Sequence, residues 1–164
     1  MTTRTQVLIP LIIAAAIIGV AGMLSLPSDV KLEYVEFPRG TVKIDDVVLE
    51  VQIADTDPLR VRGLMFQEEL PLDQGMLFVF DDSNKRSIWM LNMQFPLDII
   101  WLDNEGKVVY IEKNIPICKT VLETVTYPSY KGNGNNAKYV LEVTAGFVEE
   151  FNITKDSFLE IISI

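Results

Sequence analysis

Residues 97–112 read LDIIWLDNEGKVVYIE, and the fold class is inferred first from this segment. Two strand-like runs, Leu97–Leu102 and Lys107–Glu112, flank the segment Asp103-Asn-Glu-Gly106. This segment has the composition of a tight turn, with glycine at a position that requires a positive φ. The pattern predicts an antiparallel hairpin. Short strand-like runs on both sides of it follow one another without helices between them, so a βαβ architecture is not expected.

Period-two alternation recurs outside the hairpin. In residues 49–53, for example, apolar side chains alternate with glutamate and glutamine, which is typical of a strand with one solvated face. Two brief helices are predicted, one after Asp57-Pro58 and one at Ala145–Phe151. The other predicted strands are 32–37, 41–44, 47–54, 76–80, 87–91, 137–144 and 157–164. We therefore expect a mainly β fold, a compact antiparallel barrel or sandwich with two short helices.

Residues 7–24, VLIPLIIAAAIIGVAGML, form an uncharged apolar run. As a helix this run extends about 27 Å at 1.5 Å per residue, which is close to the thickness of the hydrocarbon layer of a bilayer. Arg4 precedes the run and Asp29 and Glu33 follow it, so the positive-inside bias predicts a cytoplasmic N-terminus and an extracytoplasmic remainder. A cleaved signal peptide is the alternative, although its apolar core is usually shorter.

The chain is too short for two ordinary domains once such an anchor is set aside. It divides into a cytoplasmic stub at 1–6, a transmembrane anchor or signal peptide at 7–24, a linker at 25–31 and one β-rich domain at 32–164. The expected location is the cell membrane, with a single pass and the globular domain outside.

Composition excludes several classes of function. The chain has 14 basic and 23 acidic residues, a net charge of −9, and such a protein repels phosphate backbones, so nucleic acid is not an expected partner. It contains no histidine, which excludes Ser-His-Asp triads, Cys-His pairs and most zinc sites. Its one cysteine, Cys118, permits no intrachain disulfide. We predict neither a cofactor nor a metal site.

Five blocks of sequence occur in a characteristic order. They are 60–66 (RVRGLMF), 75–80 (GMLFVF), 89–92 (WMLN), 96–100 (PLDII) and 139–147 (YVLEVTAGF). Together they resemble the uncharacterised prokaryotic family called domain of unknown function 192, over about residues 47–161. The resemblance implies a compact β-rich fold, often behind a signal or anchor segment, and no settled activity. Relatives often carry two cysteines after the hairpin, and the lone Cys118 departs from that pattern, which argues against a redox role there.

Two acidic residues lie within apolar runs. Asp98 either accepts hydrogen bonds from nearby backbone or from Asn92, or serves as a ligand-binding or acid/base group. Glu142 lies on the opposite strand face from its apolar neighbours, so we expect it to be solvent-exposed. If Asp98 and Glu142 faced one pocket, they would suit a carboxylate-based hydrolase or lyase, or a hard cation.

Other side chains allow a structural or a functional interpretation. Trp89, Trp101 and Tyr139 either pack in the core or form a stacking wall for a sugar. Arg60 either clamps a carboxylate or forms a surface ion pair. Asn152, in Asn-Ile-Thr, matches the N-glycosylation pattern.

The sequence supports three functional hypotheses. The first is a non-catalytic ligand-binding or envelope accessory module, with Trp89, Asn92 and Asp98 along a groove for a small molecule or carbohydrate. The second is the hydrolase or lyase that uses Asp98 and Glu142. The third is an assembly module that docks on another envelope protein through an exposed apolar patch. The lack of a recognisable catalytic constellation favours the first.

Overall fold

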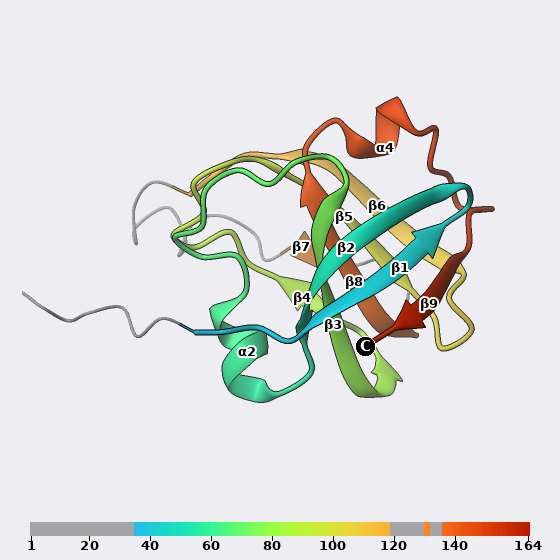
Figure 1. Ribbon diagram of the computed structural model, residues 1–164, viewed down its shortest axis with the longest axis horizontal. Helices are drawn as coiled ribbons and strands as arrows, with labels where there is room; N and C mark the ends of the chain where they lie inside the picture. The colour runs from blue at the N-terminus through green and yellow to red at the C-terminus, as the bar shows by residue number, and fades with distance from the viewer. Residues whose placement is uncertain (1–34, 119–129, 132–135) are drawn as a thin grey trace, which may run out of the picture. The chain divides into compact units, whose positions relative to one another are not determined.

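The computed structural model describes residues 35–118, 130–131 and 136–164, and residues 36–164 form one compact unit (Figure 1). Its strands are β1 Arg39–Ile44, β2 Val47–Ala54, β3 Gln74–Asn84, β4 Ser87–Ile88, β5 Leu97–Leu102, β6 Val108–Ile115, β7 Tyr130–Lys131, β8 Ala137–Thr144 and β9 Leu159–Ser163. Its helices are α2 Asp57–Arg62 and α4 Phe147–Glu150. The mainly β fold with two short helices is confirmed.

Seven strands share one sheet in the order β6-β5-β8-β3-β2-β1-β9, while β4 and β7 form a separate pair. All neighbours in the large sheet are antiparallel except β2 and β3, which are parallel. The chain leaves β2 through α2 and returns to enter β3 in the same direction, a crossover that a parallel pair requires. The expectation of an antiparallel sheet throughout is therefore wrong at this one pair.

The predicted hairpin is present as β5 and β6. The Asp103 carboxylate organises its turn by accepting hydrogen bonds from the amides of Glu105 and Lys107, both at 2.9 Å. Gly106 has a φ of 92°, the left-handed conformation that glycine adopts most readily.

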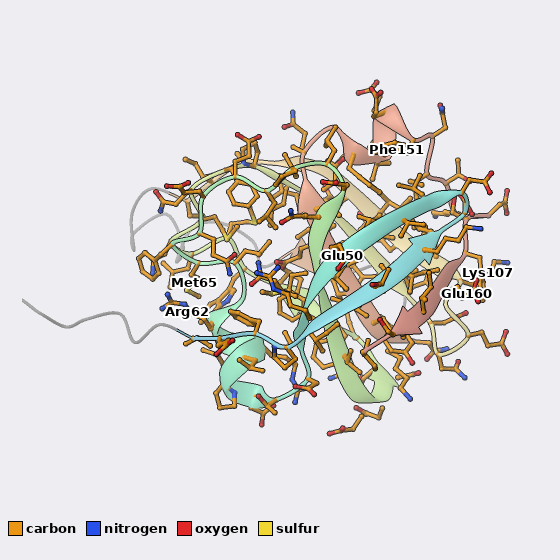
Figure 2. All side chains as sticks on the ribbon, viewed as in Figure 1. Glu50, Arg62, Met65, Lys107, Phe151 and Glu160 are labelled. Atoms are coloured by element: carbon orange, nitrogen blue, oxygen red, sulfur yellow. The ribbon has the colours of Figure 1, made fainter. Side chains whose placement is uncertain are left out.

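This turn also joins the two edges of the sheet. The Leu159 amide donates to the Gly106 carbonyl at 2.8 Å, and the Val108 amide donates to the Ser157 carbonyl at 3.2 Å. The edge strands β6 and β9 thus meet beside the hairpin turn, where Lys107 forms a backbone bridge with Phe158, and Figure 2 labels Lys107 and Glu160 at this edge. The sheet closes on itself at this end.

The apolar core lies inside the closed sheet, and a second buried layer lies on its outer face. Every residue of β5 is buried, so this strand is covered on both faces. Hydrogen bonds tie the outer face to the segments that cover it. Gln52 pairs with the Gln67 amide, the Thr144 hydroxyl donates to the Leu70 carbonyl, and the Trp101 indole donates to the Arg86 carbonyl.

The N-terminal predictions lie largely outside the described residues. No helix in the described ranges is long and apolar enough to cross a membrane. The predicted anchor at 7–24 falls outside those ranges and stays a prediction. The predicted strand 32–37 is wrong at Glu36 and Phe37, which are not in a strand, and the first strand begins at Arg39.

Gly106 and Gly146 offer a test of the sheet closure. Both have a positive φ, but a Cβ at Gly106 would lie 2.1 Å from the Leu159 carbonyl oxygen, whereas a Cβ at Gly146 would meet nothing within 4 Å. Gly146→Ala should cost about 1–2 kcal/mol of unfolding free energy from backbone strain alone. Gly106→Ala should cost at least about 2 kcal/mol more, because the closing contact must separate.

Urea unfolding measures both losses, and hydrogen exchange of the Leu159 amide reports on the closing bond. Faster exchange at this amide is expected in Gly106→Ala and not in Gly146→Ala. Equal losses of stability in the two variants would contradict the closure.

Candidate functional site

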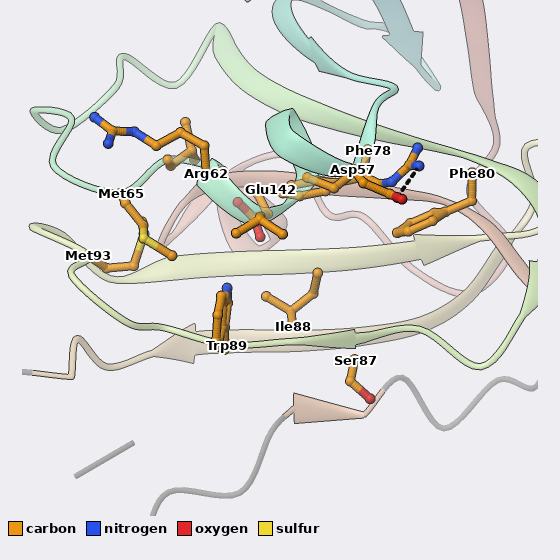
Figure 3. A pocket seen from close by; sticks show the side chains of 14 residues that line it. Asp57, Arg62, Met65, Phe78, Phe80, Ser87, Ile88, Trp89, Met93 and Glu142 are labelled. Carbon is orange, nitrogen blue, oxygen red and sulfur yellow. Dashed lines mark hydrogen bonds and ion pairs between the residues drawn. The ribbon is translucent and has the colours of Figure 1, made fainter. Parts of the chain in front are cut away.

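A cavity of about 600 Å³ opens on the outer face of the sheet (Figure 3). Strands β3 and β8 contribute to its floor. Helix α2 and residues 63–65 border one side, and β4 and its continuation toward Met93 border the other. Its apolar walls include Leu64, Met65, Phe78, Ile88, Trp89 and Met93. Figure 3 shows Glu142 between these two sides.

Glu142 lies in the row of the sheet that also contains Met76 and Ile99. Its side chain is 3% exposed, so the expectation that it faces solvent is wrong. The alternation along β8 did place it opposite Leu141, but the face that it occupies is covered by other segments of the chain. Strand periodicity separates the two faces of a sheet and does not reveal which of them is wet.

The Glu142 carboxyl group accepts no hydrogen bond from any described residue. Among the described side chains, no fully enclosed polar atom lacks a partner, so the carboxyl oxygens open onto the cavity. Burial raises the pKa of Glu142 from 4.5 to about 8. At neutral pH the group is therefore mostly a carboxylic acid, with one O–H to donate and oxygen lone pairs to accept.

Asp98 is buried as deeply as Glu142, but its carboxylate is hydrogen-bonded within the fold. Its carboxylate accepts hydrogen bonds from the backbone amides of Asn114 at 2.7 Å, Gly146 at 3.0 Å and Val148 at 2.9 Å. These bonds agree with the structural interpretation of Asp98, although none of them comes from Asn92. Asp98 thereby ties the start of α4 and the end of β6 to β5.

The two carboxyl groups lie on opposite faces of the sheet. Asp98 pairs with Val143, and Ile99 pairs with Glu142. Because paired residues point to the same side and successive residues to opposite sides, Asp98 and Glu142 point away from each other across the sheet. The hypothesis of a hydrolase, lyase or cation site built from this pair is therefore wrong.

The predicted aromatic wall does not form. Trp101 is fully buried, and its indole bonds to the Arg86 carbonyl at 3.0 Å. It pairs with Val140, which puts Tyr139 on the other face of the sheet. Of the three aromatic residues, Trp89 alone borders the cavity, and it is 52% exposed.

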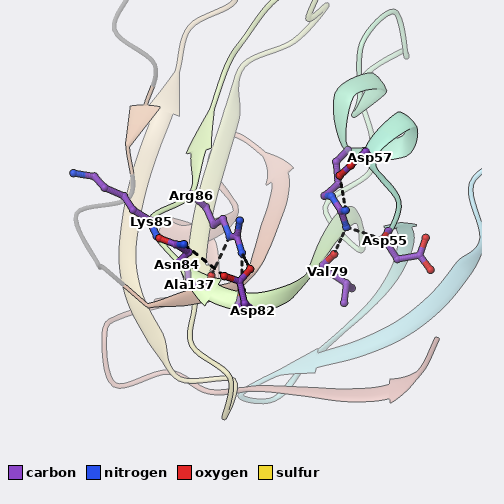
Figure 4. A network of polar contacts seen from close by, with 9 residues as sticks. Asp55, Asp57, Val79, Asp82, Asn84, Lys85, Arg86 and Ala137 are labelled. Carbon is purple, nitrogen blue, oxygen red and sulfur yellow. Dashed lines mark hydrogen bonds and ion pairs between the residues drawn. The ribbon is translucent and has the colours of Figure 1, made fainter.

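Arg60 holds α2 against the sheet. Its guanidinium donates to the carbonyls of Asp55 at 2.6 Å and Val79 at 2.7 Å, and to the Asp57 carboxylate at 2.7 Å (Figure 4). Helix α2 has no buried residue of its own, so these polar contacts replace the apolar face that usually attaches a helix. Arg60 therefore forms the predicted ion pair, and three of its five N–H donors are bonded to α2 and its neighbours.

Phe80 lies between two guanidinium groups. Arg60 is 5.2 Å and Arg86 is 4.0 Å from the centre of its ring. Arg86 is itself held by the Asp82 side chain and the Ala137 carbonyl (Figure 4). Phe80 and its two guanidinium contacts thus lie at one end of the cavity.

Arg62 borders the cavity. Of the two described arginines in the lining, it is the one that makes no hydrogen bond. Its guanidinium lies 5.1 Å from the centre of the Phe66 ring and forms no hydrogen bond or ion pair with a described residue. Arg62 therefore forms no ion pair with Glu142 in this structure.

The remaining predicted candidates are not among the residues that line the cavity, although the Asn92 side-chain amide lies 3.9 Å from the sulfur of the lining residue Met65. Asn92 has a φ of 55°, and its carbonyl accepts a hydrogen bond from the Phe66 amide, so it shapes the loop behind the cavity. Asn152 is exposed, with a φ of 54°, and its glycosylation stays a prediction. Cys118 is buried and forms a backbone bridge with Leu91.

Sequence reasoning missed most of the apolar wall. Phe78 and Met65 belong to two of the five family-like blocks, and this clustering is the one signal that could have marked them. Ile88 and Met93 come from irregular sequence around Trp89, where no periodicity assigns a face.

Comparisons with known proteins agree with this fold. The family model described as "Uncharacterized ACR", domain of unknown function 192, matches residues 40–161. A solved structure of a candidate transcription regulator from Sinorhizobium meliloti 1021 is similar, with 25% identity and a TM-score of 0.67 over 77% of this chain and 96% of that chain. A protein of unknown function from Novosphingobium aromaticivorans has 24% identity and a TM-score of 0.63 over 85% and 96%. Among curated proteins, none matches this chain.

The raised pKa of Glu142 predicts how stability depends on pH. Between about pH 4.5 and pH 8 the folded state keeps a proton that the unfolded state has lost, so this residue makes the fold less stable as pH rises, and the effect levels off above pH 8. Relative to the wild type, Glu142→Gln should gain roughly 1 kcal/mol per pH unit across this window.

Chemical denaturation at half-unit pH intervals measures the difference between variant and wild type, which cancels all other titrating groups. Glu150→Gln, which removes an exposed carboxylate, is the matched control and should stay parallel to the wild type. A constant difference between Glu142→Gln and the wild type would show that Glu142 is not desolvated.

Proposed function

This chain belongs to the family called domain of unknown function 192, and from that premise we propose that its domain is a non-catalytic module that binds a small, largely apolar molecule in the cavity beside Glu142. One observation carries the proposal. The Glu142 carboxyl group is buried, faces an apolar cavity and bonds to no described residue. A polar group in this situation lowers the stability of the fold unless water or a ligand in the cavity supplies the missing partner.

The contrast with Asp98 supports a ligand role for Glu142. Asp98 is buried to the same degree, and the fold directs three backbone amides at it. The same sheet provides no donor for Glu142. A carboxyl group that served only to hold the structure together would need such donors.

The size and lining of the cavity also suit a small organic molecule. Its volume of about 600 Å³ lies within the range of ordinary ligand pockets, which are mostly apolar and contain a few convergent polar groups. Trp89 provides a large exposed aromatic face at the rim. The ligand we propose has an apolar body against these walls and one polar group at Glu142.

Nucleic acid is not part of the proposal. One structural relative is described as a candidate transcription regulator, but the net charge of −9 on this chain opposes contact with phosphate backbones. Among the described residues that line the cavity, Arg60 and Arg62 are the basic ones, which is fewer than a nucleic-acid surface needs, and Arg60 is paired with Asp57.

We further propose that residues 7–24 anchor the domain in the cell membrane, with the binding cavity on the extracytoplasmic side. The support is the uncharged apolar run and the distribution of charge around it.

After cell lysis the full chain should sediment with membranes, resist extraction by high salt and dissolve in detergent. Recovery of the uncleaved chain in the soluble fraction would refute the anchor.

The binding function can be tested by thermal-shift screening of the full chain against apolar amines, apolar acids, sugars and short peptides. We expect at least one apolar class to raise the melting temperature. Trp89→Ala should weaken the affinity for that class about tenfold or more, because it removes the aromatic wall at the rim.

Phe158→Ala is the matched control, since Phe158 is an exposed aromatic residue outside this cavity. It should leave the affinity unchanged. Stabilisation by none of the four classes, or an equal effect of both substitutions, would count against a binding function for this cavity.

A further inference from the structure

No basic side chain among the described residues forms an ion pair with the buried acid of the cavity. The charged residues that border it besides Glu142 are Asp57, Arg60 and Arg62, all on α2, and β3 and β4 contribute none. Arg60 donates to three acceptors on α2 and its neighbours, and Arg62 lies against Phe66. Burial alone raises the pKa of Glu142, and no basic group lowers it.

We propose, resting on the binding function above, that the ligand of this cavity carries a primary or secondary ammonium group on an apolar stem, and that the ammonium ion pairs with the Glu142 carboxylate. The stem lies along the apolar walls. An ammonium group donates hydrogen bonds and supplies the positive charge that the buried carboxylate lacks, so it satisfies both needs of this group at once.

Two features of the chain favour a cation over an anion or a neutral polar ligand. The net charge of −9 raises the local concentration of cations around the domain. Trp89 at the rim presents an exposed indole, the aromatic ring that attracts cations most strongly. An anionic ligand would place a second negative charge beside Glu142, with Arg62 as the one uncommitted cation among the described lining residues.

Binding of an ammonium group is coupled to loss of the Glu142 proton. The free domain holds the carboxyl group in its neutral form at pH 6, and the ion pair requires the carboxylate, so the proton leaves to solvent as the amine binds. Affinity should therefore rise with pH until Glu142 is ionised in the free domain, while the amine stays protonated below about pH 10.

Phenethylamine and 2-phenylethanol, which differ in the polar group on one stem, distinguish the ammonium from neutral polar ligands. Isothermal titration of the full chain at pH 6, 7, 8 and 9 should show phenethylamine affinity rising roughly a hundredfold in total, about tenfold per unit up to pH 8 and flattening above it. The alcohol should bind more weakly at pH 9 and show no such rise.

Glu142→Gln should remove the pH dependence and most of the amine affinity, while Glu150→Gln, an exposed carboxylate away from the cavity, should behave as the wild type. If amine and alcohol bind equally at every pH, or if another class from the thermal-shift screen binds and phenethylamine does not, the ammonium assignment is overturned and the binding function stands. If no molecule binds in either experiment, both proposals fail.

Discussion

Strand β5 and most of strand β8 are buried on both faces, and the environments of Asp98 and Glu142 follow from this burial. Closure of the sheet buries their inner face, and segments outside the sheet that include Leu70 and Arg86 cover part of their outer face. A strand buried on both sides leaves no solvated position for a polar side chain. Asp98 and Glu142 are both withdrawn from water by this arrangement, on opposite sides of the sheet. The role of each carboxyl group then depends on the hydrogen-bond donors present on its face of the sheet.

On the inner side, Asp98 receives three backbone amides, so its burial orders the end of β6 and the start of α4. On the outer side, Glu142 is flanked by Met76 and Ile99, neither of which can donate a side-chain hydrogen bond. The same residue chemistry thus produces a structural anchor on one face and an unpaired, mostly neutral acid on the other. The difference arises from local packing rather than from the two residues themselves.

Local sequence pattern predicted much of the fold and little of the cavity. The strands 47–54, 97–102 and 137–144 and the helix after Asp57-Pro58 agree with the structure, because alternation and turn residues act over a few positions. The parallel pairing of β2 with β3 and the cover over the outer face are contacts between distant segments, which no short window contains. For that reason the alternation placed Glu142 on the correct face of the sheet but wrongly predicted that this face is exposed to solvent there.

Glu142 also shows what the fold gives up at this position. An apolar residue between Met76 and Ile99 would complete the outer layer and remove the unfavourable desolvation of a carboxyl group. A glutamate that lowers the stability of the free protein, where an apolar residue would raise it, is expected when the glutamate acts in a ligand-bound state. Functional sites commonly have lower stability than an optimised core would have. In the ligand-bound state that we propose, the ligand would supply the partner that the fold omits, and binding would then stabilise the fold through that same contact.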